Sequence, residues 1–194
     1  MERPAKATLR EQVRLQLFTL APELRGSLSQ MLCDLIRSQP AWRDAASVML
    51  FSPLRDEPEV SALLNDALAE RKLVCLPRFD GAQGVYSGAQ VSSRADLVAG
   101  RFGALEPNAD CPVVPLNHLD LVLVPGIAFD LAGRRLGRGK GFYDRLLAEV
   151  SGHKCGVVFD VQIVAEIPEE PHDVRVNSIV TPTRWLGCGL QVEG

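Results

Sequence analysis

The stretch LDLVLVPG, residues 119–126, is the most strongly apolar segment of the chain and the one that decides its fold. Its run of Leu and Val is typical of a strand buried on both faces of a parallel sheet. A loop rich in glycine and arginine follows, and KGFYDRLLAEV (140–150) then predicts the start of a helix. A strand that leads through a loop into a helix indicates the α/β class.

The same alternation of strand and helix recurs on both sides of this stretch. Short apolar runs predict further strands at SVMLF (47–51), KLVCLP (72–77), KCGVVF (154–159) and NSIVTP (177–182). The segment PEVSALLNDALAER (58–71) predicts a crossover helix that starts at Pro58 and Glu59. Such strand–helix–strand units build parallel sheets.

Two regions flank or interrupt these units. Apolar residues at three- and four-residue intervals predict two amino-terminal helices joined near Ala21–Pro22. Residues 79–118 are less regular: GAQGVYSG (81–88) suggests a hairpin, and FGALEPNADCPVVPL (102–116) reads as a loop. We expect one three-layer αβα domain over residues 1–194, with a mostly parallel central sheet, amino-terminal helices and an irregular or hairpin excursion around 79–118.

Composition excludes several classes of protein. The 194 residues carry a formal net charge of −3 and no long basic tail, so nucleic-acid binding is not expected. No apolar run approaches the length of a membrane span, which predicts a cytoplasmic protein without a membrane partner. The five scattered cysteines indicate reduced thiols, of which Cys75 and Cys155 are expected in the core. The sequence has no obvious exposed apolar stripe, so we expect a monomer.

The three histidines carry weaker signals. His118 precedes the central strand and His153 a later one, so both are expected in exposed turns. His172 is next to Asp173, where it is a candidate neighbour of a metal ligand.

The loop DLAGRRLGRGKGFYDRLL (130–147) concentrates glycine and positive charge and suggests a phosphate-rich ligand. The phosphate-binding pattern G-x-x-x-x-G-K-[ST] fails because position 134 is Arg and position 141 is Gly. The dinucleotide pattern G-x-G-x-x-G fails because Phe142 stands in place of its third glycine. These two common phosphate motifs are therefore excluded.

The remaining explanation is a loop whose glycines leave backbone amides free to bind phosphate, directly before the amino terminus of a helix, which also favours anions. Arg135, Arg138 and Lys140 are spaced so that their charged groups could surround a triphosphate. Asp144, four residues after Lys140, offers a carboxylate to a magnesium ion on the same phosphates. A nucleotide with a metal ion is the ligand that these residue types favour.

The segment LDLVLVPGIAFDLAGRRLGRGKGFYDRLL (119–147) closely resembles the signature of the 5-formyltetrahydrofolate cyclo-ligase family. Scattered similarity continues over most of the chain, in KATLR (6–10), DEPEV (56–60), LPRF (76–79) and HDVRVNSIVTP (172–182). The resemblance implies ATP- and magnesium-dependent conversion of 5-formyltetrahydrofolate to 5,10-methenyltetrahydrofolate, with release of ADP and phosphate.

The resemblance also implies roles for individual residues. Arg138, Lys140 and Tyr143 would be catalytic, Asp144 and Asp173 would bind magnesium, and Arg78 would lie near the folate. The residues implied to bind ATP are Lys6, Arg10, Arg135, Leu136, Gly137, Arg138, Gly139, Lys140, Gly141, Phe142 and Tyr143. The residues implied to bind the folate are Ser52, Glu57, Arg138, Gly139, Lys140, Gly141 and Phe142.

The chemistry suits these residue types. Cations and magnesium would bring the formyl oxygen to ATP, the γ-phosphoryl group would move to that oxygen, and the N10 amine would close the ring. Glu57 could accept paired N–H groups from the pterin. The chain departs from the family pattern at Phe142, where many members carry Tyr, and at Asn177, where Asp is frequent.

Two other hypotheses stay open on the sequence. One is a relative of the same fold that binds folate or nucleotide but has lost turnover. The other is an ATP-dependent enzyme that acts on another formyl or carboxamide compound.

Overall fold

An eight-stranded sheet forms the centre of the computed structural model, which describes residues 5–189. The strand order is β12-β11-β10-β7-β1-β2-β3-β6, and the five strands from β11 to β2 run parallel to their neighbours. The outer strands β12, β3 and β6 pair antiparallel. The sheet strands are β1 (Ser47–Met49), β2 (Leu73–Asp80), β3 (Val85–Gln90), β6 (Val113–Val114), β7 (Leu121–Pro125), β10 (His153–Val157), β11 (Ser178–Val180) and β12 (Trp185–Gly187).

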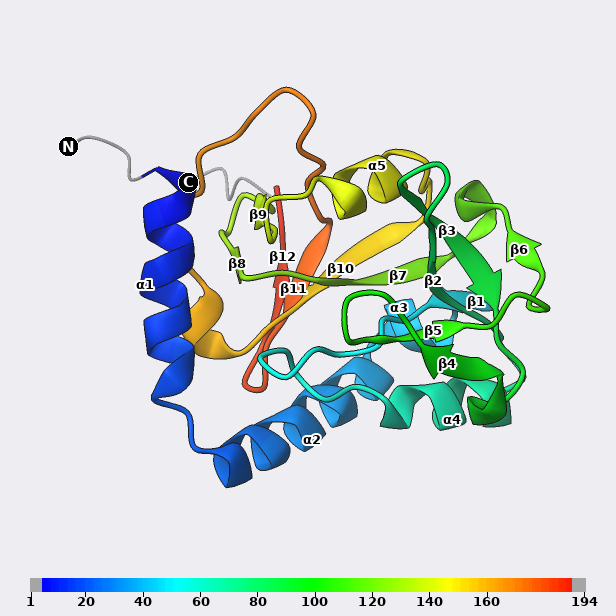
Figure 1. The fold of residues 1–194 in the computed structure, drawn as a ribbon. Helices are drawn as coiled ribbons and strands as arrows, with labels where there is room; N and C mark the ends of the chain where they lie inside the picture. Colours follow the sequence, from blue (N-terminus) through cyan, green and yellow to red (C-terminus); the bar gives the residue numbers. More distant parts are fainter. Residues whose placement is uncertain (1–4, 190–194) are drawn as a thin grey trace.

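Helices cover both faces of the sheet, as Figure 1 shows. Alternation along the central strand divides the core: Leu121 and Leu123 pack with the helices on one face, and Val122 and Val124 pack with the helix on the other. The predicted three-layer αβα fold is confirmed. The helices are α1 (Lys6–Phe18), α2 (Pro22–Ser38), α3 (Pro40–Arg43), α4 (Ala62–Ala69) and α5 (Phe142–Ala148), with α2 and α4 on one face and α5 on the other.

Two short hairpins lie outside the main sheet. Strands β8 (Ala128–Phe129) and β9 (Arg135–Leu136) fold the connection after β7 into a hairpin, and α1 packs Leu9, Val13 and Leu17 against it. Strands β4 (Leu97–Ala99) and β5 (Leu105–Pro107) form the second hairpin. Because α1 packs against the β8–β9 hairpin, this amino-terminal helix lies near the carboxyl end of the central strand β7, where the glycine-rich loop begins.

Most of the sequence predictions of secondary structure are confirmed. The two amino-terminal helices meet at Ala21–Pro22, and residues 79–118 contain the expected hairpin. The second part of this excursion is more ordered than predicted, because 102–116 contains β5 and β6. All five cysteines are free thiols, and Cys75 and Cys155 are fully buried.

The predicted start of the crossover helix at Pro58 and Glu59 is wrong. Helix α4 begins at Ala62, and the amide of Glu59 donates to Ser29 Oγ of α2 at 2.9 Å instead of entering a helix. This hydrogen bond links the segment before α4 to α2.

Apolar side chains are exposed on the two amino-terminal helices, contrary to the premise of the monomer prediction. Leu15 and Phe18 of α1, and Leu24 and Met31 of α2, are exposed. The monomeric state stays a prediction, as do the single-domain assignment and the cytoplasmic location. Within residues 5–189, no helix combines the length and the apolarity that crossing a bilayer would require.

The expectation for His118 is confirmed and that for His153 is wrong. His118 is exposed, whereas His153 is half-buried in β10, where its ring stacks on Trp185 and its Nε2 lies 2.8 Å from Ser178 Oγ. Strand β10 starts one residue earlier than the apolar pattern indicated, because His153 pairs with Leu121 of β7 and its amide donates to the carbonyl oxygen of Asp120 at 2.8 Å.

The environment of His153 predicts a pH dependence of stability. Burial, with a smaller effect of the Lys154 ammonium, lowers the pKa of His153 below its usual 6.5. Between the lowered pKa of the folded protein and the usual 6.5 of the unfolded chain, the unfolded chain binds more protons than the folded protein. Stability therefore rises with pH in this range and is lost as pH falls. We expect the urea midpoint to be lower at pH 5 than at pH 7.5. His153→Gln should flatten this difference and His118→Gln should not; an unchanged slope in His153→Gln would contradict the assignment.

Candidate active site

A cavity of about 590 Å³ opens at the carboxyl ends of β1 and β7. This is the edge at which open α/β sheets bind ligands. Except for Arg78, every site residue implied by the sequence resemblance lines this cavity, although these residues come from distant parts of the chain. They are Lys6, Arg10, Ser52, Glu57, Arg135, Leu136, Gly137, Arg138, Gly139, Lys140, Gly141, Phe142, Tyr143, Asp144 and Asp173.

The glycine-rich loop reaches the cavity between β9 and α5. Gly139 has a φ of 95° and Gly141 a φ of 63°, in the left-handed region that side chains disfavour. This backbone path carries Arg138 and Lys140 over the cavity and starts α5 at Phe142. The side chain of Leu136 is fully buried against α1, so its contribution to a ligand site would come from its backbone.

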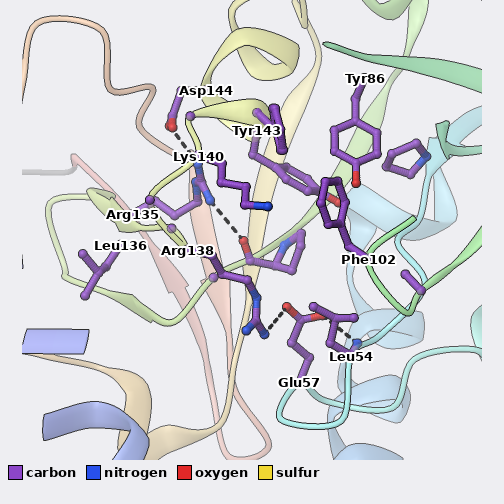
Figure 2. Close-up of a pocket in the computed structure, with 18 of the residues that line it drawn as sticks. Leu54, Glu57, Tyr86, Phe102, Arg135, Leu136, Arg138, Lys140, Tyr143 and Asp144 are labelled. Carbon is purple, nitrogen blue, oxygen red and sulfur yellow. Dashed lines mark hydrogen bonds and ion pairs between the residues drawn. The ribbon is translucent and has the colours of Figure 1, made fainter. Parts of the chain in front are cut away.

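Arg138 is joined to two acids of the turn after β1. Its Nη2 donates to Asp56 Oδ1 at 2.5 Å. It also donates to Glu57 Oε1 at 3.0 Å, as Figure 2 shows. The other oxygen of Glu57 accepts the amide of Leu54 at 2.9 Å. Burial raises the pKa of Glu57 above its usual value, although the Leu54 amide and Arg138 oppose this. The turn thus fixes a carboxylate beside the loop cation.

Arg135 and Asp144 form a second pair inside the cavity wall. Arg135 Nη2 donates to Asp144 Oδ1 at 2.8 Å, and the two side chains are 5 % and 15 % exposed. The Nε of Arg135 is buried without a hydrogen-bond partner among the described residues. Its guanidinium also lies 5.5 Å from the ring centre of Tyr143.

Lys6 forms the third pair, with Asp173. Its Nζ donates to Asp173 Oδ2 at 2.7 Å and to Glu170 Oε2 at 3.1 Å. Burial opposes the ionised form of Asp173, but hydrogen bonds from Lys6 and from the amide of Glu170 hold its pKa below the usual value. Nearby, Arg10 of α1 donates from Nε to the carbonyl oxygen of Gly137 at 2.8 Å and so fixes the start of the loop.

The carboxylates at this end of the cavity suit magnesium. One oxygen each from Glu170 and Asp173 and a nitrogen of His172 lie within 4.8 Å of one another. Oxygen is the ligand that magnesium prefers, and Asp144 keeps a second oxygen without a partner among residues 5–189. His172 is exposed, and its Nε2 lies 3.5 Å from Glu170 Oε2 and 3.8 Å from Asp173 Oδ1. Its place beside a metal ligand stays a prediction.

Lys140 differs from the other cations because, among residues 5–189, its ammonium meets only aromatic rings. Its Nζ lies 4.1 Å from the ring centre of Phe102 and 5.9 Å from that of Phe142. Figure 2 shows the side chain extending toward Phe102 across the cavity.

Burial, followed by the charge of Glu57, raises the pKa of Tyr143, so its phenol stays protonated.

Three further residues that the sequence resemblance singled out form hydrogen bonds within the protein. Ser52 Oγ accepts the amide of Leu105 at 2.9 Å at the edge of the cavity. Arg78 does not line the cavity, because its guanidinium binds the carbonyl oxygens of Asn108 and Cys111 at 2.8 and 2.9 Å. Asn177 joins β10 and β11 by accepting the amide of Lys154 at 2.8 Å.

Sequence reasoning missed several residues of the cavity. Asp56 does not line the cavity but pairs with Arg138, and it could have been suspected from its place beside Glu57. Tyr86, Phe102 and Glu106 line the cavity, but they are in the irregular region and match no local pattern. Glu106 is 8 % exposed, one of its oxygens accepts the amide of Phe79, and the other has no partner among residues 5–189. The remaining missed residues that line the cavity are Leu54, Pro77, Ala104, Leu105, Pro125, Gly126 and Glu170.

The open, mostly parallel sheet with a glycine- and cation-rich loop after its central strand defines an α/β protein that can hold an anionic ligand at the strand ends. The model of the 5-formyltetrahydrofolate cyclo-ligase family matches residues 2–182. The chain therefore belongs to this family of ligases, which confirms the resemblance seen in the sequence.

Individual relatives agree with this assignment. The 5-formyltetrahydrofolate cyclo-ligase of Mycolicibacterium smegmatis is 39 % identical over 147 residues, which cover 72 % of this chain and 75 % of the relative. The enzyme of that name from Escherichia coli K12 is 30 % identical over 177 residues, which cover 89 % and 97 %.

Solved structures give the same fold. The NMR structure of Aquifex aeolicus 5,10-methenyltetrahydrofolate synthetase matches with a TM-score of 0.85 and 34 % identity, over 97 % of this chain and 96 % of that one. The Mycoplasma pneumoniae 5,10-methenyltetrahydrofolate synthetase matches with a TM-score of 0.74 over 92 % and 99 %. At 19 % identity the second match shows the fold alone.

Proposed function

We propose that the chain converts 5-formyltetrahydrofolate to 5,10-methenyltetrahydrofolate, using ATP and magnesium and releasing ADP and phosphate. The observation that carries the proposal is the contact between Arg138 and Glu57, 3.0 Å apart in one cavity. Arg138 is a candidate phosphate ligand and Glu57 a candidate pterin ligand. Their contact supports a site in which the two substrates meet.

The nucleotide would bind where Lys6, Arg10 and Arg135 converge. These side chains come from α1 and β9 and line the same end of the cavity. The buried Nε of Arg135 has no partner among residues 5–189, and burying an unpaired donor is costly. A phosphate oxygen is an acceptor that would satisfy it.

Asp144 and Asp173 would hold magnesium, which would supply positive charge that opposes the negative charge of the ATP phosphates. In the structure these carboxylates are neutralised by Arg135 and Lys6. Both cations are themselves candidate phosphate ligands, so ATP could draw them away from the carboxylates. We therefore expect the nucleotide and the metal to bind together.

The folate would lie between Glu57 and the aromatic side chains, with its formyl oxygen toward Arg138 and Lys140. These cations would orient the weakly nucleophilic oxygen toward the γ-phosphorus and oppose the negative charge of the phosphates. The formyl oxygen would bond to the γ-phosphorus as the bond to ADP breaks. N10 would then attack the formyl carbon and lose its proton, and phosphate would leave with the formyl oxygen.

An absorbance assay tests this function. Methenyltetrahydrofolate formation is followed with 5-formyltetrahydrofolate, with and without ATP and magnesium, and product is expected only when both are present. Binding of both substrates without product would favour a relative that has lost turnover. ATP hydrolysis stimulated only by another formyl or carboxamide compound would favour a different substrate.

Glu57→Gln is expected to raise the KM for 5-formyltetrahydrofolate about 10–100-fold, because a hydrogen bond to a charged group is lost. The Glu57 side chain is only 7 % exposed, so water compensates poorly. The KM for ATP should change by less than about threefold. Both constants are measured by steady-state kinetics.

Glu59→Gln provides the matched control, because Glu59 is an exposed acid two residues away whose oxygen accepts the amide of Ser61. It should leave both KM values near those of the unaltered enzyme. An unchanged folate KM in Glu57→Gln would remove Glu57 from the folate site.

A further inference from the structure

Apart from Arg10, which donates to the carbonyl oxygen of Gly137, the cations around the cavity fall into two groups. Lys6, Arg135 and Arg138 are each paired with a carboxylate. Lys140 and a second cation, Arg101, have neither an ion pair nor a hydrogen bond within residues 5–189, and both are exposed. The two groups therefore differ in what they can offer a ligand: the first must exchange partners, whereas the second is free to accept an anion.

The unpaired cations surround four aromatic side chains, which we call the aromatic cluster: Phe79, Tyr86, Phe102 and Phe142. Phe142 lies 5.2 Å from Phe79, 5.6 Å from Tyr86 and 5.7 Å from Phe102 between ring centres. Tyr86, Phe102 and Phe142 line the cavity. The cluster therefore gives one wall of the cavity flat apolar surfaces, on which a planar ring can pack.

Two guanidinium groups lie at the outer side of this cluster. Arg101 lies 5.1 Å from the ring centre of Phe79, and Arg145 lies 5.2 Å from that of Phe142. Arg145 is also exposed and has no ion pair among the described residues; its Nη2 donates to the carbonyl oxygen of Gly84 at 3.1 Å. Neither group lines the cavity, so both are placed beyond the rings rather than inside the pocket.

The turn 81–84 between β2 and β3 connects the two arginines. Arg145 donates to the carbonyl oxygen of Gly84. Arg101 lies beside Gly81, because a Cβ atom added to that glycine would be 4.0 Å from Arg101 Nη1. The acid at this turn, Asp80, is engaged elsewhere, because its Oδ1 accepts the amides of Ala82 and Gln83. The two guanidinium groups thus border one short turn, and neither is ion-paired with Asp80 or with any other carboxylate among residues 5–189, so both can pair with an anionic ligand.

We propose that Arg101 and Arg145 bind the carboxylates of the glutamate tail of the folate, while its aminobenzoyl ring packs on the aromatic cluster. This inference rests on the proposed function. The order of groups in the substrate, pterin, aminobenzoyl ring and glutamate, matches the order Glu57, aromatic cluster and arginine pair. Arginine suits this role because its planar fork pairs with carboxylates.

The test compares two ligands that differ only in the tail: 5-formyltetrahydrofolate and 5-formyltetrahydropteroate, which lacks glutamate. Binding is measured by calorimetry without ATP, so it is independent of turnover. The unaltered protein should bind the folate about tenfold more tightly, since two exposed ion pairs contribute modestly. The double variant Arg101→Gln/Arg145→Gln should bind both ligands equally, with an unchanged affinity for ATP.

The matched control is Arg43→Gln, because Arg43 is exposed in α3 just before β1, at the opposite edge of the sheet. It should keep the tenfold preference for the folate. An equal loss of both ligands in the double variant would mean that the arginines only support the aromatic rings and would overturn the proposal. A selective loss of ATP affinity would assign the pair to phosphate and would also overturn it.

Two results with the unaltered protein are decisive as well. Equal binding of the two ligands would overturn the tail subsite and leave the proposed function intact. Failure to bind either ligand would contradict the proposed function itself, and the tail subsite with it.

Discussion

Replacing Lys140 with Met is expected to lower kcat roughly 10²–10³-fold, the effect typical of removing one preorganised group that stabilises the transition state. Lys140 would oppose the charge of the transferring phosphoryl group as a point charge. Its ammonium contacts only the rings of Phe102 and Phe142 within residues 5–189. The fold therefore does not depend on it, and the melting temperature should change by no more than about 2 °C.

Steady-state kinetics and thermal unfolding check this prediction together. Lys154→Met is the control, because Lys154 is at the amino-terminal end of β10, away from the cavity, and should leave kcat unchanged. Lys140→Arg keeps the charge and should recover part of the lost rate. If Lys140→Met kept more than about a tenth of the kcat, the catalytic role assigned to Lys140 would be wrong.

The sheet was predictable where its residues follow a simple local pattern. Each parallel strand of the centre is a short apolar run, and the two amino-terminal helices repeat apolar residues at helical intervals. The hairpin of β8 and β9 gives no such signal, because its strands have two residues each and one contains Arg135. Its stability comes from α1, which is more than a hundred residues away and packs against it.

The candidate site was predictable to the extent that it follows a family signature. The loop from Arg135 to Asp144 is contiguous, so its residues could be named from the sequence. Their partners could not be assigned, because pairing depends on the folded chain: Arg138 meets Glu57 across 81 positions of sequence. The ion pairs also show that candidate ligands for phosphate and for metal neutralise one another, which no spacing rule would indicate.

Asp144→Ala is expected to lower stability by about 3–5 kcal/mol, the cost of leaving one partner of a buried ion pair uncompensated. Arg135, 5 % exposed, would lose its only carboxylate among residues 5–189 and would keep the unpaired Nε that it already has. For a domain of this size the loss corresponds to a fall in melting temperature of roughly 6–20 °C. Thermal and urea unfolding measure it.

The double variant Arg135→Met/Asp144→Leu separates structure from function. Replacing both charges with apolar side chains removes the unpaired guanidinium, so most of the lost stability should return. Calorimetric binding of ATP with magnesium should nevertheless stay weak, because the candidate phosphate and metal ligands are both gone. If the double variant were as unstable as Asp144→Ala, the pair would not be the cause of the loss. If it bound ATP normally, Arg135 and Asp144 would have no part in the nucleotide site.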